Sequence, residues 1–232
     1  MSAALTLISS MATRHLLAAL AQAHAQAGAP ATHLQSLGGV DAARRVQEGE
    51  AVDVVVLASD AIAKLLAAGC LRPGSVRPIA DSSMAIAVRA GGTPPDVSGE
   101  AALRATLLQA RRIGYSTGPS GTALLQLFEQ WGLAGTLKDR LVQARPGVPV
   151  GQLVADGEAE IGFQQFSELM DVGGITMLSM PPELDIVSRF SGAVAASAAQ
   201  PAAAQALLDF MASPATAALK RQHGMRPVPA LH

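Results

Sequence analysis

The chain has 232 residues, a length that suits one large domain or two small ones. Half of the residues are hydrophobic, 15% are charged and the formal net charge is −1, a composition that supports a sizeable core and excludes extensive disorder. No basic stripe interleaved with aromatic residues occurs, which argues against nucleic-acid binding. Cys70 is the only cysteine, so the chain has neither an internal disulfide nor a cysteine-based zinc site.

The N-terminal residues 3–8 have the pattern of a first strand rather than of a signal peptide. No basic segment precedes them, and no small-residue cleavage site follows a long apolar core. The chain lacks an uninterrupted apolar run of about 18 residues, so we expect no membrane span. The sequence as written predicts a cytoplasmic protein, or a periplasmic one if a precursor signal has been removed.

Strand-like and helix-like segments alternate along the chain, which predicts an α/β fold with mostly parallel sheets flanked by helices. The strongest strand signal is Val-Asp-Val-Val-Val-Leu at Val52–Leu57. The expected strands span residues 4–9, 32–36, 52–57, 82–88, 112–115, 160–164, 175–178 and 186–195. The expected helices span residues 13–25, 41–48, 61–68, 101–109, 122–131, 150–155, 201–211 and 214–223.

The sequence contains no long linker, so two lobes would have to be joined by strands that cross between them. Segments 82–88 and 186–195 are the candidates. We therefore expect lobe one to comprise residues 1–82 and 189–232, and lobe two to comprise residues 83–188. Because open α/β sheets bind ligands beyond the carboxyl ends of their strands, we expect a ligand cleft between the lobes.

The run Gly-Tyr-Ser-Thr-Gly-Pro-Ser-Gly at Gly114–Gly121 has the pattern of a strand end, a loop and a helix start. A helix start exposes backbone N–H groups that no intrahelical carbonyl satisfies, and the helix dipole is positive there. Both features suit an anion. Ser120 and Gly121 are therefore candidate ligand-binding residues, although Ser120 has the alternative role of a helix cap.

Other small polar residues adjoin the predicted strands. They are Ser9 and Ser10 after the first strand, Gly38-Gly39-Val40 before the second helix, Ser83 at the start of a strand, and Gln164 and Gln165 after another strand. Each also has a structural interpretation, as a cap, a turn or a surface residue. Their recurrence at several strand ends favours a shared anion pocket.

Enzyme signatures are scarce. The chain has no G-x-S-x-G elbow, Walker loop, dinucleotide-binding G-x-G-x-x-G or H-E-x-x-H motif, so we expect neither a cofactor nor a metal. Glu168, Tyr115 and His33 are the candidate acid–base residues, yet none has a spacing that demands catalysis.

The order of these segments resembles the type II periplasmic binding proteins, particularly the molybdate-binding proteins of ABC transporters. The resemblance spans nearly the whole chain. It is carried by Ser9-Ser10-Met11, by residues 43–49 leading to the strand at 52–56, by Pro119-Ser120-Gly121-Thr122, and by residues 150–154 and 157–162. It implies a two-lobe fold that closes on a small anionic ligand, with an ABC permease as partner if the protein is exported.

The resemblance also implies which residues hold the ligand. Ser10 matches a serine ligand, Ser120 or Gly121 matches a backbone donor, and Val148 to Val150 match another. Two positions differ from the family pattern: Gly39 and its neighbours replace a serine-rich loop, and Gln165 replaces a tyrosine. These changes favour a planar carboxylate at least as much as tetrahedral molybdate.

Aconitate isomerase resembles the same branch of the fold, and the chain is similar to it in the Gly-Pro-Ser-Gly loop and in residues 157–165. Two hypotheses follow. The first is a solute-binding protein that closes on a carboxylate or oxyanion. The second is an isomerase of a small di- or tricarboxylic acid that uses the same cleft.

Overall fold

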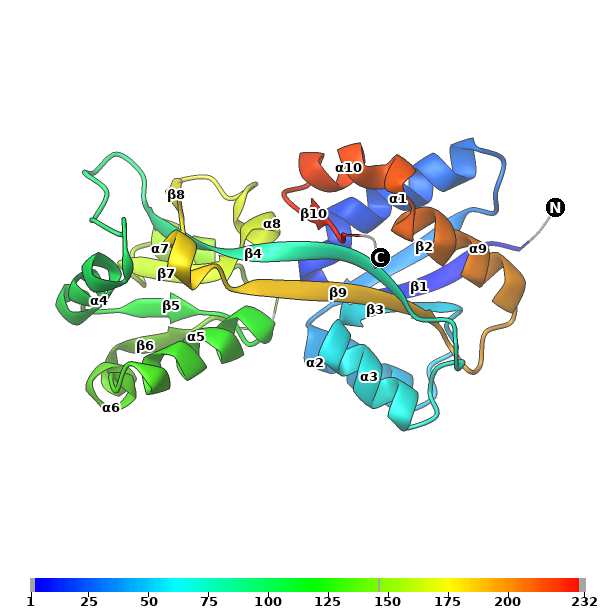
Figure 1. Ribbon diagram of the computed structural model, residues 1–232, viewed down its shortest axis with the longest axis horizontal. Coiled ribbons are helices and arrows are strands. Elements are labelled where there is room, and N and C mark those ends of the chain that lie inside the picture. The colour runs from blue at the N-terminus through cyan, green and yellow to red at the C-terminus, as the bar shows by residue number, and fades with distance from the viewer. Residues whose placement is uncertain (1–2, 146, 230–232) are drawn as a thin grey trace. The chain divides into compact units, whose positions relative to one another are not determined.

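The computed structural model describes residues 3–145 and 147–229. The chain divides into two compact units, one formed by Met1–Ser82 and Arg189–His232 (unit 1), the other by Ser83–Ser188 (unit 2). Two long strands, β4 (Arg77–Arg89) and β9 (Val187–Val194), each contribute residues to both units (Figure 1). The chain therefore passes between the units within strands rather than through flexible linkers.

Unit 1 is built on a central parallel trio in the order β2-β1-β3. Its strands are β1 (Leu5–Ser10), β2 (Thr32–Leu37), β3 (Val54–Ala58) and β10 (Arg226–Pro227), with parts of β4 and β9. Its helices are α1 (Arg14–Gln26), α2 (Gly39–Gln47), α3 (Ser59–Ala67), α9 (Pro201–Ala212) and α10 (Ala217–Gln222), and two 3-10 turns span Met11–Thr13 and Pro214–Thr216. Strands β9 and β10 pair antiparallel with β3 and β4 respectively.

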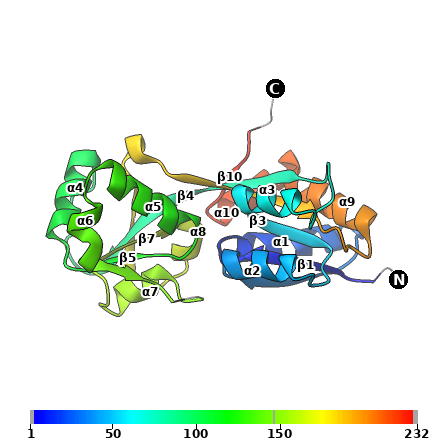
Figure 2. The ribbon, with the colours of Figure 1, turned by 90° about the horizontal axis from the view of Figure 1, so that it is seen from below.

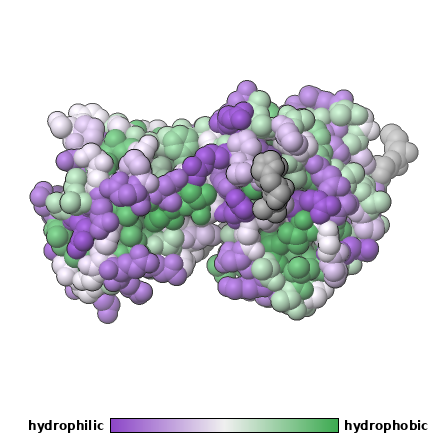
Figure 3. Space-filling view, in the orientation of Figure 1, coloured by the Kyte–Doolittle hydropathy of each residue, from purple (hydrophilic) through white to green (hydrophobic). Residues whose placement is uncertain are grey.

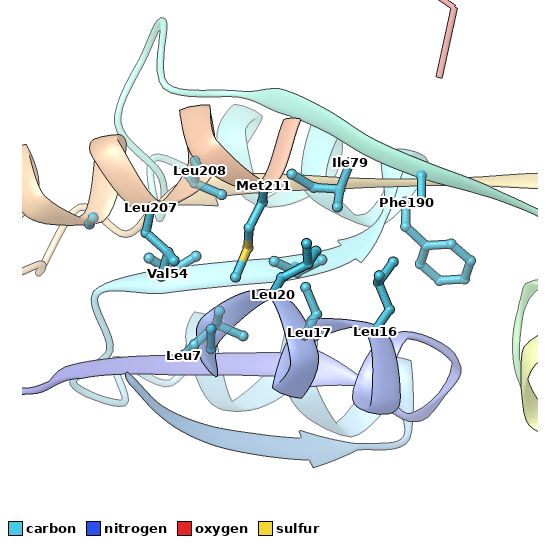
Figure 4. Packing of buried hydrophobic residues seen from close by; sticks show 14 of the residues in the cluster. Leu7, Leu16, Leu17, Leu20, Val54, Ile79, Phe190, Leu207, Leu208 and Met211 are labelled. Carbon is cyan, nitrogen blue, oxygen red and sulfur yellow. The ribbon is translucent and has the colours of Figure 1, made fainter. Parts of the chain in front are cut away.

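Helices cover both faces of the unit 1 sheet because its central strands are apolar on both sides. All five residues of β3 are buried: Val54 and Val56 pack under α1 and α9, whereas Val55 and Leu57 pack under α2 and α3. Figure 4 shows the first of these cores, in which Leu17 and Leu20 of α1 lie close to Met211 of α9. A continuous apolar run is typical of such a doubly covered strand.

Unit 2 contains the parallel trio β6-β5-β7, and β7 pairs antiparallel with β4. Its strands are β5 (Ile113–Tyr115), β6 (Leu141–Gln143), β7 (Ile161–Gln165) and β8 (Ile175–Ser179). Its helices are α4 (Glu100–Gln109), α5 (Pro119–Gln130), α6 (Ala134–Leu137), α7 (Val150–Ala155) and α8 (Phe166–Leu169), with 3-10 turns at Lys138–Arg140 and Pro182–Leu184. Strand β8 pairs antiparallel with the other edge of β4.

Alternation along β4 separates the two cores of unit 2. Met84, Ile86 and Val88 face α4 and α5, while Ala85 and Ala87 face α7, as the period of two in a strand requires. Figure 2 shows α4, α5 and α6 on one side of this sheet and α7 on the other. On the face of the molecule seen in Figure 3, hydrophilic and hydrophobic residues are interspersed over each unit.

The α/β fold expected from the sequence is confirmed, with differences at the strands that cross between units. Strand β4 begins at Arg77 rather than Ser82, and its first half pairs with β10 (Arg226↔Asp81). The two trios are parallel, whereas the crossing strands add antiparallel pairs, so the sheet is mixed. Strands β6 and β10 and helices α6 and α8 were not expected, since each is four residues or shorter.

Candidate functional site

The carboxyl end of β1 holds two buried serines in different environments. Ser9 Oγ lies 2.9 Å from Ser36 Oγ of β2, a contact that follows from the Ser9↔Ser36 register. Ser10 Oγ has only a 3.5 Å contact with Thr13 Oγ1, which is the weak limit of a hydrogen bond. The Ser9 hydroxyl is thus committed to the sheet, and the Ser10 hydroxyl is the freer donor.

The start of α2 lies beside Ser10. A Cβ atom added to Gly39 would stand 3.8 Å from Ser10 Cβ, and the preceding N-cap residue, Gly38, supplies no side-chain hydrogen bond to the helix. Val40 is 72% exposed in the same first turn, and half-buried Met11 directly follows Ser10. The fold therefore brings an uncapped helix start next to a serine hydroxyl within unit 1.

In unit 2, the loop between β5 and α5 buries a second pair of hydroxyls. Ser116 Oγ and Ser120 Oγ lie 2.9 Å apart, and the Gly118 N–H donates to Ser116 Oγ at 3.3 Å. Helix α5 begins at Pro119 without a side-chain cap, so the Ser120 and Gly121 amides fall in its first turn. A side chain at Gly121 would collide with the Ser116 carbonyl oxygen, hence the loop requires glycine there.

The end of β7 presents two adjacent glutamines with different partners. Gln164 Oε1 accepts a 2.6 Å hydrogen bond from the Val150 N–H at the start of α7. Gln165 Nε2 donates to Ser188 Oγ at 2.6 Å. The backbone donor of Val150 is thereby satisfied within the protein, so any contact of Val150 with a ligand would involve its other atoms.

Ser83 lies elsewhere in unit 2. It lines a cavity of about 300 Å³ together with Met84 and Ala85 of β4, Phe166 of α8 and Met180. Pro182 also lines the cavity, and its other polar lining residues are Ser179 and Asp185. Ser83 and Met84 are neighbours in β4, so their side chains point to opposite faces of the sheet. Met84 lies opposite Gln165 in the pair of β4 with β7, and a ligand contact of Ser83 would therefore be on the other face.

The three acid–base candidates are widely distributed. Tyr115 ends β5, half-buried against the unit 2 core, and Glu168 lies in α8, three residues after Gln165. His33 is exposed on β2 and pairs with Thr6. Thr6 is four residues before Ser10 on β1, so His33 is about 13 Å along the strand from the Ser10 end.

Within residues 3–145 and 147–229, no group of three or more histidine, cysteine, aspartate or glutamate side chains is arranged to hold a metal ion. In the same ranges, no helix is long and apolar enough to cross a membrane.

Residues 5–226 match the family described as bacterial extracellular solute-binding protein. The chain belongs to this family. Aconitate isomerase from a Pseudomonas species is 38% identical over 190 residues, which cover 80% of this chain and 71% of that protein. The molybdate-binding protein ModA from Rhodobacter capsulatus is 26% identical over 108 residues, or 47% of this chain and 43% of that protein.

Solved structures of other binding proteins share the fold of this solute-binding protein. The periplasmic molybdate-binding protein of Azotobacter vinelandii superposes with a TM-score of 0.80 at 20% identity, covering 97% of this chain and all of that one. The resemblance of the sequence to type II, two-lobe periplasmic binding proteins is therefore confirmed.

Two polar residues that contact the candidate residues were not predicted from the sequence. Ser36 and Ser188 each bond to a candidate residue, Ser9 and Gln165 respectively. Both lie inside strand-like segments with no glycine or proline beside them. Only contacts between segments distant in sequence identify them, and no local signal could have done so.

Proposed function

We propose that this protein binds a small anion, a carboxylate or an oxyanion, at the polar loops described above. The observation that carries the proposal is the first turn of α5, where uncapped amides at Ser120 and Gly121 adjoin the buried Ser116–Ser120 hydroxyl pair. Helix N-termini with hydroxyl donors are suited to anions without needing a cation. Ser10 beside the uncapped start of α2 supplies the equivalent chemistry in unit 1.

The proposed ligand-binding residues come from both units. They are Ser9, Ser10, Met11, Gly39 and Val40 in unit 1, and Ser83, Ser120, Gly121, Val150 and Gln165 in unit 2. We propose that the units act as two lobes, 1–82 plus 189–232 and 83–188, which close on the ligand about β4 and β9. Hinge closure of this kind is a common response to ligand binding.

Two further parts of the proposal rest on family membership. Solute-binding proteins described as extracellular act outside the cytoplasmic membrane, so we propose a periplasmic location. We also propose an ABC permease as the partner that receives the ligand.

Thermal unfolding tests anion binding directly. The panel consists of molybdate, tungstate, sulfate, and di- and tricarboxylates, each compared with chloride at the same ionic strength. A ligand that binds only the folded state adds about 2.7 kcal/mol of stability at 100 times its Kd. At least one anion should raise the melting temperature. If none does so at millimolar concentration, the proposal is wrong.

Isomerisation of a small di- or tricarboxylic acid is the second candidate function, favoured by the 38% identity to aconitate isomerase. In such a reaction a base removes a proton from one carbon, the double bond shifts, and a proton returns to another carbon. Glu168 and Tyr115, both in unit 2, are the proposed proton carriers. Donors at Ser10 and Ser120 would stabilise the negative charge that develops on the carboxylate.

Proton NMR distinguishes the two functions. The protein is incubated with trans-aconitate in D₂O, and new vinyl signals or loss of exchangeable C–H signals would indicate turnover. A Glu168→Gln variant should then lose turnover yet keep the ligand-induced rise in melting temperature. An unchanged spectrum together with a positive thermal shift leaves binding alone.

A further inference from the structure

The amide of Gln165 has one end without a hydrogen-bond partner. Gln165 is the last residue of β7 and is 1% exposed. Its Nε2 donates to Ser188 Oγ at 2.6 Å, whereas its Oε1 is buried and has no partner in the part of the chain that the structure describes. Burying an unpaired carbonyl oxygen costs free energy, so such an atom needs a reason to be there.

Turning the amide over does not remove the unpaired end. The Ser188 hydroxyl both donates and accepts, so it can pair with either the nitrogen or the oxygen of the amide. In each orientation Ser188 satisfies one end and leaves the other unpaired. The arrangement therefore offers an acceptor in one orientation and a donor in the other, at the same point in space.

The neighbouring glutamine provides a contrast within the same strand. Gln164 is equally buried, and its Oε1 accepts the Val150 N–H at 2.6 Å, which fixes the start of α7. Gln164 thus has a structural role that its hydrogen bond explains. No such bond explains the burial of the Gln165 amide oxygen, which lies at the strand end where the proposed ligand-binding loops begin.

We infer that the free end of the Gln165 amide binds a carboxyl group of the ligand, with Ser188 holding the other end. This inference rests on the proposed anion-binding function and names its substrate class: organic carboxylic acids. A carboxyl or hydroxyl group that carries a proton donates to Oε1, and an ionised carboxylate accepts from the turned amide. A tetrahedral inorganic oxyanion without a proton can only accept from the turned amide, as an ionised carboxylate does. Organic acids can also carry hydroxyl or protonated carboxyl groups that donate to Oε1, so the pair Gln165–Ser188 selects for organic acids.

Calorimetric titration of the full chain tests this selectivity. Trans-aconitate, citrate and tricarballylate are compared with molybdate and sulfate for the wild type and for Gln165→Leu, which keeps nearly the same shape without polar ends. We expect the wild type to bind at least one organic acid more tightly than either inorganic ion. Gln165→Leu should weaken the organic acid at least 10-fold and weaken inorganic-ion binding by a smaller factor.

Stability of the free protein separates a ligand contact from a structural role. Because Gln165→Leu removes a buried unpaired atom and half-buried Ser188 can pair with water, the variant should melt no lower than the wild type. Gln152→Leu, at an exposed glutamine of α7 bonded to Asp156, is the control and should bind like the wild type. Ser188→Ala should weaken the organic acid by a smaller factor, since the amide remains but is no longer oriented.

Three outcomes would overturn the inference. Unchanged organic-acid affinity in Gln165→Leu would mean that a buried water, not the ligand, satisfies Oε1. Equal loss for all anions would mean a general contact without selectivity. A lower melting temperature with normal affinity would assign Gln165 a structural role. If no anion binds the wild type at all, the proposed function itself fails along with the inference.

Discussion

Strand β1 has polar groups at both ends, and the two ends differ in how completely those groups are paired. Near its amino end, the Asp53 carboxylate accepts hydrogen bonds from Thr6 N and Oγ1 at 2.9 and 3.0 Å and from the Ala199 and Gln200 amides at 3.0 and 3.2 Å. At the carboxyl end, Ser10 Oγ has only a 3.5 Å contact with Thr13, next to the uncapped start of α2.

This difference separates a structural region from a proposed binding region. Asp53 joins β1, β3 and the segment before α9, and its carboxylate accepts four hydrogen bonds. At the carboxyl end, the Ser10 hydroxyl has a long contact and the start of α2 has no side-chain cap, an arrangement that a folded protein tolerates where a ligand supplies an acceptor. We therefore expect changes at Asp53 to lower stability and changes at Ser10 to lower affinity.

The largest effect should come from Asp53→Ala. Charge-assisted hydrogen bonds contribute about 1.5–3 kcal/mol, and the buried Asp53 carboxylate accepts several of them, so we expect a loss of about 3 kcal/mol of unfolding free energy. Urea unfolding measures this loss. Asp60→Ala, at an exposed residue of α3, is the control. A loss below about 1 kcal/mol would contradict the anchoring role of Asp53.

Gly121→Ala extends the comparison to unit 2, where one residue serves both stability and binding. The new Cβ would collide with the Ser116 carbonyl, so the first turn of α5 must shift. We expect a loss of about 2 kcal/mol in stability and the loss of anion-induced thermal stabilisation. Gly135→Ala is the matched control, because a Cβ there meets no atom within 4 Å. Equal behaviour of the two variants would show that the loop accommodates a side chain.

Acid should weaken the amino end selectively. Burial alone would raise the pKa of Asp53, but the hydrogen bonds from Thr6, Gln200 and Ala199 outweigh it and hold the pKa below the ordinary 3.8. A carboxyl whose pKa is lowered by folding contributes stability above its ordinary pKa and loses it as the pH falls through the lowered value. The melting temperature should therefore fall below about pH 4, by less in Asp53→Asn. Parallel acid profiles for the two proteins would refute this assignment.

The smallest effects should distinguish the adjacent serines at the carboxyl end. Ser9→Ala breaks the 2.9 Å contact with Ser36 and should cost about 1 kcal/mol of stability. Ser10→Ala breaks no short bond, so its melting temperature should match the wild type while anion affinity falls about 5- to 10-fold. Calorimetry measures the anion affinity of both variants, and thermal unfolding measures their stability. The prediction is wrong if Ser9→Ala lowers affinity alone and Ser10→Ala lowers stability.

Local sequence patterns were sufficient to predict most helices and strands. The apolar run at Val52–Leu57 predicts a strand, and β3 forms there and packs on both faces. Short elements such as β6 and α8 escaped prediction because three or four residues hold too little periodicity. Helix α5 begins at Pro119 rather than Thr122, since proline suits the first turn of a helix.

The polar residues at strand ends were likewise visible in the sequence, because small hydroxyl and glycine residues after an apolar run mark a loop that can hold a ligand. Their division into roles was not visible. Gln164 and Gln165 are identical in type and adjacent, yet one caps α7 through Val150 and the other pairs with Ser188. That distinction depends on where the start of α7 and the first residues of β9 lie around the end of β7, and no local pattern encodes those contacts.

The sequence by itself therefore determined the class of fold and the loops that carry polar donors, because these follow from periodicity and residue type, and its motifs carried the resemblance to the family. Tertiary structure decided which donors are already used. It paired Ser9 with Ser36 and left Ser10 with a long contact. It also satisfied Gln164 while leaving the Gln165 amide oxygen without a partner among the residues that the structure describes. A hydrogen bond joins two atoms in space, so only the packed chain can say which polar groups remain for a ligand.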